Sequence, residues 1–291
     1  MSRKGLLLFL AVGVAWGLPY FFIAIAVEHF SSISLVWLRV AIGTAVLLPI
    51  AIQRKALGPA LRAWPWVLVF AVLEMVGPWW LITEAERDIT SSLAGLLITT
   101  VPFITSFVLG LLGDRASWHP ITVLGLVLGF SGVVALVGVD AFSHSLPIVP
   151  VLMVLAAAVG YAVAPIIANR KIRHVPTFGV VTLSLAMVTV IYAIPAAFTL
   201  PADLAAQPPA EAWWAIIGLG LLCSALAFVL FFALIKEIGP ARSTLITYVN
   251  VAVAMVLGIA LLNEPLTLGI AIGLPLVVMG SYLASRDRTP T

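Results

Sequence analysis

Ten stretches of this 291-residue chain are apolar and long enough to cross a lipid bilayer as helices. A hydrocarbon core of ~30 Å requires about 20 helical residues. Stretches that meet this requirement fall at roughly 5–27, 33–52, 64–85, 90–112, 120–139, 147–168, 177–199, 213–235, 242–262 and 267–285. Because lipid offers no hydrogen-bond partners to an open backbone, such stretches must be helical. The sequence therefore predicts an all-α integral membrane protein with ten transmembrane helices.

The composition excludes a water-soluble fold. Only 9% of residues are charged and 63% are hydrophobic, whereas about a quarter of a soluble domain is charged. The longest connection, at about 200–212, is a Pro/Ala-rich loop too short to be a domain. We therefore predict one transmembrane transporter domain over residues 1–291. Arg3 and Lys4 lead directly into the first apolar stretch, which we interpret as a spanning helix rather than a removable signal.

The basic residues indicate how the chain is oriented. If the N-terminus is cytoplasmic, thirteen of the fifteen Lys and Arg residues fall on that side, Arg87 falls outside and Arg39 lies within a helix. The thirteen are Arg3, Lys4, Arg54, Lys55, Arg62, Arg115, Arg170, Lys171, Arg173, Lys236, Arg242, Arg286 and Arg288. Positively charged loops stay in the cytoplasm, so we predict a multi-pass protein of the cell (inner) membrane with both termini cytoplasmic. These scattered charges predict contact with lipid and no nucleic-acid partner.

The two halves of the chain resemble one another. Trp64 and Trp214 open matching helices (214 − 64 = 150), and Asp114 and Glu264 end matching helices (264 − 114 = 150). We place repeat one at about 5–139 and repeat two at about 147–285. Five helices are an odd number, so the second repeat enters the membrane from the opposite side. Inverted repeats around a central cavity are common in secondary transporters, although some channels share the plan.

Short motifs occur in a fixed order: Ala15-Trp16-Gly17, Leu38-Arg39, Ala85, Ser91-Ser92-Leu93-Ala94, Pro102, Asn263-Glu264-Pro265-Leu266, Gly273 and Gly280. Their order and spacing resemble the drug/metabolite transporter superfamily, and specifically its EamA-type ten-helix transporters. The chain departs from the family pattern at Asp114, where a glutamate is usual, and at Gly160-Tyr161, where a tryptophan is usual. The resemblance implies a five-plus-five bundle whose cavity is lined by helices 1, 3, 4, 6, 8 and 9. It is greatest to bacterial exporters of amino acids and related metabolites.

Arg39 and Glu74 are the most informative charged residues. Arg39 lies ~9 Å below the outer end of the second helix at 1.5 Å per residue, and Glu74 lies near the middle of the third. A charge at this depth costs about 2.5–3.5 kcal/mol and normally faces protein or water. Our hypothesis is that Arg39 binds the carboxylate of a zwitterion, and that Glu74 binds its ammonium group or a coupling proton. The alternatives are a structural ion pair, or an Arg39 side chain that extends to the headgroups.

Aromatic and polar side chains supply further candidates. Trp16 and Tyr20 share one face of the first helix, where Pro19 favours local opening. We expect Trp16, Tyr161 and Tyr248 to lie deep enough to line a cavity, whereas Trp79 and Trp80 fit the aromatic belt at the outer interface, as do Trp64, Trp66, Trp118, Trp213 and Trp214. The polar candidates are Thr99, Thr100, Ser224, Tyr248 and Asn250. Their alternative role is ordinary hydrogen bonding between helices.

Other function classes lack support in the sequence. The chain has no G-x-x-x-x-G-K-[ST] phosphate loop, and its histidines show no metal-ligand spacing. We therefore predict a carrier of small organic solutes, most simply an exporter of amino acids that works by alternating access, with no cofactor, no catalytic residues and no bound metal. Two alternatives remain open, namely a multidrug or lipid-precursor exporter and a passive solute channel.

Overall fold

The computed structural model describes residues 2–114, 119–143, 147–238, 243 and 246–285, and every regular element in this part of the chain is a helix. Each predicted stretch coincides with one helix or with a broken helix. These are α1 (Arg3–Ala26), α2 (Ser32–Gln53), α4 to α5 (Trp64–Ala85), α6 to α7 (Ser91–Leu111), α8 (Pro120–Ser143), α9 (Ile148–Lys171), α10 (Thr177–Ala205), α11 to α12 (Ala210–Ile238), α14 (Ile246–Leu261) and α15 (Leu268–Ser285). Among the described residues, seven of these helices or broken helices are long and apolar enough to cross a membrane, while α8, α14 and α15 contribute shorter apolar stretches. The chain is therefore a multi-pass helical membrane protein.

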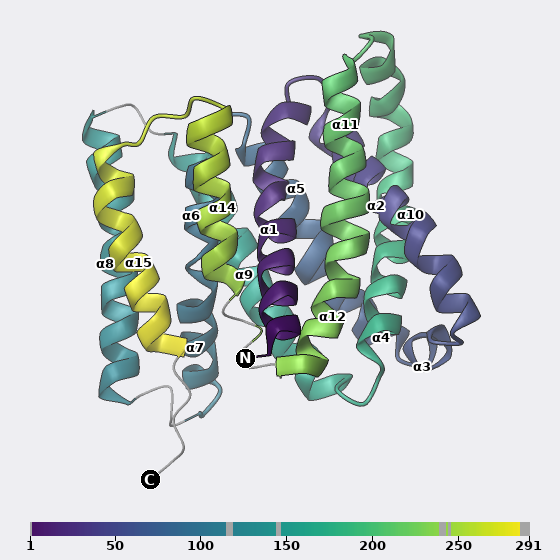
Figure 1. The fold of residues 1–291 in the computed structure, drawn as a ribbon, viewed down its shortest axis with the longest axis horizontal. Coiled ribbons are helices and arrows are strands. Elements are labelled where there is room, and N and C mark those ends of the chain that lie inside the picture. The colour runs from purple at the N-terminus through teal and green to yellow at the C-terminus, as the bar shows by residue number, and fades with distance from the viewer. Residues whose placement is uncertain (1, 115–118, 144–146, 239–242, 244–245, 286–291) are drawn as a thin grey trace.

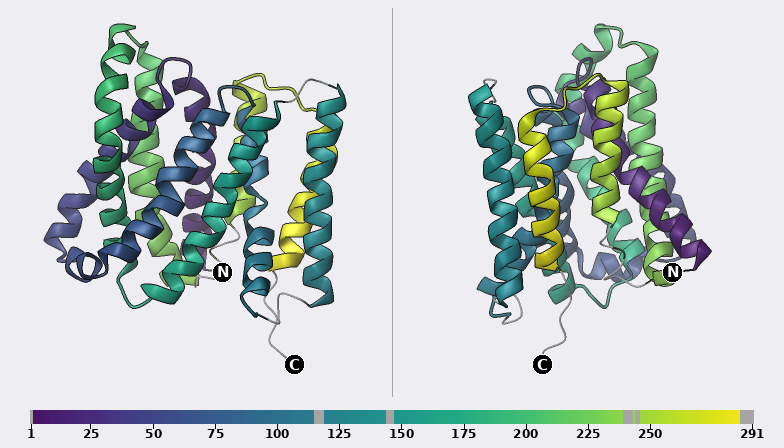
Figure 2. Two further views of the ribbon diagram at one scale, coloured as in Figure 1. Left: turned by 180° about the vertical axis from the view of Figure 1, so that it is seen from behind. Right: turned by 60° about the vertical axis from the view of Figure 1, so that its left-hand side comes forward.

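The helices run up and down in one bundle. The first residues of α1 and the last turn of α15 lie at the same end, which also holds the short helix α3 (Leu57–Arg62) (Figure 1). The helices α8 and α15 lie side by side at one flank of the bundle (Figure 2). They approach closely because Gly280 contacts the backbone of Gly125 and Gly129, where a side chain would not fit. Outward-facing Val127 and Phe130 of α8 are exposed, as expected for a lipid-facing surface.

Three of the spanning helices are interrupted. The π-helical segment η1 (Val72–Val76) joins α4 (Trp64–Ala71) to α5 (Gly77–Ala85), and η3 (Leu219–Leu226) joins α11 (Ala210–Gly218) to α12 (Ala227–Ile238). In the third, α6 (Ser91–Ile98) ends at Thr99 and Thr100, and α7 (Val101–Leu111) begins just before Pro102. Segments of π-helix inside α-helices are frequent at functional sites, so η1 and η3 direct attention to the middle of the bundle.

Two local expectations are wrong. The helix α10 continues to Ala205 through Pro201 and α11 begins at Ala210, so most of the predicted loop at 200–212 is helical. The hydroxyl of Ser31 donates a 2.8 Å hydrogen bond to Asp203 and so ties this last turn to the start of α2. Helix α1 continues through Pro19 without a break, so the local opening expected there does not occur. Predictions for Arg115, Trp118, Arg242, Arg286 and Arg288 lie outside the described residues.

Candidate functional site

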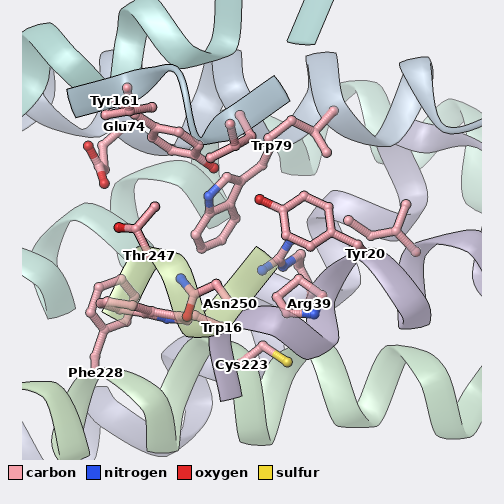
Figure 3. A pocket seen from close by; sticks show the side chains of 15 residues that line it. Trp16, Tyr20, Arg39, Glu74, Trp79, Tyr161, Cys223, Phe228, Thr247 and Asn250 are labelled. Atoms are coloured by element: carbon pink, nitrogen blue, oxygen red, sulfur yellow. The ribbon is translucent and has the colours of Figure 1, made fainter. Parts of the chain in front are cut away.

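A cavity of about 260 Å³ lies where α1, α2, η1, α5, α9, η3, α12 and α14 meet. Six of the predicted site residues line it: Trp16, Tyr20, Arg39, Glu74, Tyr161 and Asn250 (Figure 3). They come from both halves of the chain. The two π segments contribute directly, since η1 carries Glu74 and η3 carries Cys223.

Arg39 is buried, with 4% of its surface exposed. Its guanidinium carbon lies 4.0 Å from the centre of the Trp79 ring, and its Nε donates a 3.4 Å hydrogen bond to the hydroxyl of Ser224. This position excludes extension of the side chain to the headgroups. Because both contacts are with neutral groups, the charge of Arg39 is held in place without being neutralised.

Glu74 provides an acid on the same cavity. Its Oε2 is buried and has no hydrogen-bond partner. Among the described residues, the ion pairs within 4.0 Å are Lys4–Glu237 and Arg87–Glu84, and Arg39 and Glu74 do not form one. The structural ion pair considered from the sequence is therefore absent from the described part of the chain. A fixed cation and an acid face the same small volume without contacting each other.

Aromatic rings form much of the wall. Trp16 packs against Phe228 and Phe231, with ring centres 5.4 and 4.7 Å apart. The expectation that Trp79 belongs to the interfacial belt is wrong. Only 8% of its surface is exposed, and it lines the cavity beneath Arg39. Trp79 lies near the end of its helix, where an aromatic side chain is usually interfacial. Its burial depends on how neighbouring helices pack against α5, which the sequence alone does not show.

Three predicted site residues, Thr100, Ser224 and Tyr248, are not among the lining residues of the described cavity. The Thr100 hydroxyl donates to the carbonyl of Leu97, 2.7 Å away, and so caps the end of α6. The hydroxyl of Ser224 accepts the hydrogen bond from Arg39, which lines the cavity. Asn250 lines the cavity, yet its amide group is positioned to donate to the carbonyls of Ile246 and Gly13. Thr247, Phe228 and Cys223 line the cavity but were not predicted.

A second pocket of about 370 Å³ opens at the opposite end from the N-terminus and includes Glu28, Glu86, Arg87 and Glu264. Glu264 caps the start of α6, where it accepts hydrogen bonds from the backbone N–H groups of Ser91 and Ser92, at 2.7 and 3.0 Å, and from the Ser92 hydroxyl at 2.5 Å. A carboxylate at a helix N-terminus is electrostatically favourable.

Glu86 is the functional candidate that the sequence reasoning missed. Glu86 is 6% exposed, and both of its carboxylate oxygens are buried without a hydrogen-bond partner. Burial raises the pKa of Glu86 well above its usual range, the neighbouring Glu264 raises it further, and the charge of Arg39 lowers it. Its place just after α5 suggested a solvated connection.

Comparison with known proteins identifies the family of this chain. The model of the EamA-like transporter family matches the chain twice, over residues 3–138 and over residues 148–286. Together these matches cover nearly the whole sequence. The chain belongs to the EamA-like transporter family, within the drug/metabolite transporter superfamily.

Individual relatives agree with this assignment. The chain is 26% identical to the uncharacterized transporter YvbV of Bacillus subtilis (strain 168) over 98% of its own length and 92% of that protein. It is also 26% identical to the uncharacterized inner membrane transporter YedA of Escherichia coli (strain K12), over 94% and 90% of the two chains. One solved structure, described only as a crystal structure of a protein, superimposes with a TM-score of 0.67 at 22% identity and covers 97% of this chain. That structure supports the fold alone.

Proposed function

We propose that this protein is a secondary transporter that exports amino acids or related small metabolites by alternating access. The observation that carries the proposal is that Arg39 of α2 and Glu74 of η1 line one cavity without pairing. Arg39 is held by the neutral groups of Trp79 and Ser224, and the Oε2 atom of Glu74 has no hydrogen-bond partner. A zwitterion presents a carboxylate and an ammonium group at a short distance from each other. Arg39 takes the carboxylate and Glu74 takes the ammonium group.

The size and wall of the cavity favour a small solute. Its volume of about 260 Å³ lies below the ~300–1,000 Å³ that drug-sized ligands occupy. Trp16, Tyr20, Tyr161 and Phe228 leave an apolar space beside the two charges. Such a wall accepts different apolar side chains on a common zwitterionic group, so we expect broad specificity.

The transport cycle that we propose uses ten spanning helices in two inverted five-helix repeats, with both termini in the cytoplasm. The two successive family matches support a duplication. The π segments support it too, since Glu74 and Ser224 lie 150 residues apart (224 − 74 = 150) in η1 and η3. Matched halves allow inward-open and outward-open states of similar energy.

A multidrug or lipid-precursor exporter is the second candidate. The contact of Trp16 with Phe228 and Phe231 favours it, because clustered aromatic rings bind hydrophobic cations. In that function Arg39 would be a structural charge. Competition by tetraphenylphosphonium separates the two candidates, since it would abolish drug export and leave amino-acid exchange nearly unchanged.

Counterflow in liposomes tests the proposal. Vesicles preloaded with unlabelled amino acids are given labelled leucine, threonine, phenylalanine or lysine outside. We expect saturable uptake that vanishes without internal amino acids. Unsaturated uptake that ignores the internal solute would instead indicate a channel.

Two substitutions assign the site within the same assay. Arg39→Gln and Glu74→Gln should each reduce counterflow about 10- to 100-fold, the loss of one buried hydrogen bond to a charged group. The exposed residues Arg62 and Glu211 provide the matched controls Arg62→Gln and Glu211→Gln, which should exchange like the wild type. Wild-type exchange by both cavity variants would contradict the proposed site.

A further inference from the structure

Glu86 lines the second pocket, called the outer pocket below, together with Glu264. The charge of Arg39, which lines the central cavity, also acts on it. The two carboxylate oxygens of Glu86 are buried and have no hydrogen-bond partner. A buried carboxylate without partners is very costly, so such a group tends to bind a proton.

The neighbouring acid Glu264, in contrast, is engaged in hydrogen bonds. Its two oxygens accept three hydrogen bonds from Ser91 and Ser92 at the start of α6. These bonds make Glu264 the cap of α6, and its neighbouring charge favours the protonated form of Glu86.

The remaining charged and titratable groups around Glu86 come from several elements. Arg87 is engaged elsewhere, since it donates to the carbonyl of Phe30 and the hydroxyl of Ser32 and pairs with Glu84. The groups that face Glu86 or share its pocket are Tyr20 of α1, Glu28 after α1, Arg39 of α2, Arg87 and Glu264. Of the two cations, only Arg39 is held by neutral partners alone.

We propose that Glu86 is the proton-binding residue of the transport cycle, loaded through the outer pocket, and that Arg39 links it to the solute so that proton and solute bind together. The inference rests on the proposed function, because it uses Arg39 as the carboxylate site. Glu74 is then left to the ammonium group of the solute.

The sign of the linkage follows from the charges. Arg39 favours the ionised form of Glu86, so in the solute-free protein it weakens the binding of a proton there. When a solute carboxylate occupies Arg39, this effect is lost, and a carboxylate oxygen of Glu86 binds a proton from the outer pocket more tightly. By thermodynamic reciprocity a protonated Glu86 leaves Arg39 free and strengthens solute binding.

This linkage has a consequence for export. Proton and solute move in the same direction, so net export continues only while the outward solute gradient exceeds the inward proton gradient. The protein would therefore export solute only at high internal concentration, and net export would stop when that concentration falls.

Calorimetry measures the linked proton directly. The amino acid with the strongest counterflow, among leucine, threonine, phenylalanine and lysine, is titrated into purified protein in two buffers of different ionisation enthalpy, at several pH values up to about 9, because a Glu86 that is already protonated takes up no further proton. We expect wild-type protein to take up a proton on binding and Glu86→Gln to take up none while still binding. Glu86→Asp should restore the uptake, and Glu84→Gln, a substitution of a partly exposed acid two residues away, should leave it unchanged. Proton release, or uptake that persists in Glu86→Gln, would overturn the proposal.

Transport separates failure of this inference from failure of the proposed function. With the membrane potential clamped, a gradient of one pH unit should drive up to about tenfold accumulation of the same amino acid. Glu86→Gln should lose this accumulation and keep counterflow. Wild-type counterflow without accumulation in a pH gradient, or accumulation driven by sodium instead, would refute the proton site alone. Absence of counterflow in the wild type would refute the proposed function.

Discussion

The central cavity and the outer pocket both bury charged side chains, but they stabilise them differently. In the cavity, Arg39 rests on the ring of Trp79 and the hydroxyl of Ser224. In the outer pocket, Glu264 is bound by the N-terminal donors of α6, and Glu86 beside it has no hydrogen-bond partner. A charge held by neutral groups remains available to a ligand, whereas a charge used as a helix cap is structural.

The largest effect is expected at the structural charge of the outer pocket. Glu264→Gln replaces one acceptor oxygen by an amide nitrogen and so leaves the N–H group of either Ser91 or Ser92 without its acceptor. We expect the free energy of unfolding in mixed micelles to fall by about 3 kcal/mol. Asp203→Asn, which affects one hydrogen bond near the surface, is the control. Equal stability of the two variants would mean that Glu264 is not the cap described here.

A smaller effect is expected from the pH dependence of stability, which isolates Glu86. Since the pKa of Glu86 is higher in the folded protein than in the unfolded chain, its stabilising contribution is complete at pH below the ordinary value of about 4.3 and is lost as pH rises through the raised pKa. The wild type should therefore lose apparent Tm toward alkaline pH more steeply than Glu86→Gln.

The change in stability caused by Glu86→Gln should be smaller than the change caused by Glu264→Gln. The reason is that only part of the titration of Glu86 falls within the pH range that detergent-solubilised protein tolerates. The Tm difference between Glu86→Gln and the wild type should rise from pH 5 to pH 9. Glu84→Gln should follow the wild-type curve. Parallel curves for all three proteins would show that Glu86 does not titrate.

The cavity side of the comparison is tested by Trp79→Leu. Removal of the ring beneath Arg39 costs a cation–π contact of about 1 kcal/mol, so solute affinity in counterflow should fall about fivefold. Trp80→Leu is a matched control, because Trp80 follows directly in α5 and does not line the described cavity. A larger loss of solute affinity in Trp80→Leu than in Trp79→Leu would contradict the placement of Trp79 in the binding cavity.

The smallest effect is expected from Ser224→Ala. Its bond to Arg39 is long, at 3.4 Å, so we expect about a twofold loss of affinity, at the lower limit for a neutral hydroxyl partner. Ser184→Ala, at a buried hydroxyl on α10 without a hydrogen-bond partner, should have no effect on exchange. A loss in Ser224→Ala as large as in Arg39→Gln would show that the hydroxyl itself binds the solute.

Hydropathy predicted where the apolar helices lie but not how they end or break. Each predicted stretch coincides with a helix because twenty apolar residues leave the backbone no other stable state in lipid. The extension of α10 to Ala205 was missed because the bond between Ser31 and Asp203 joins residues far apart in the chain. The π segments were missed because they arise within uniformly apolar helices, whose composition gives no local signal.

The sequence by itself determined the class of protein, the helical segments and the family motifs, because these depend on composition and on local spacing. It also identified Arg39 and Glu74, since a charge deep in an apolar helix requires a special environment. Only the tertiary structure decided that Trp79 belongs to the cavity, that Arg39 and Glu74 do not pair, and that Glu86 is buried beside Glu264. The physical reason is that burial and charge–charge distance are set by how separate helices pack, and no local pattern records that packing.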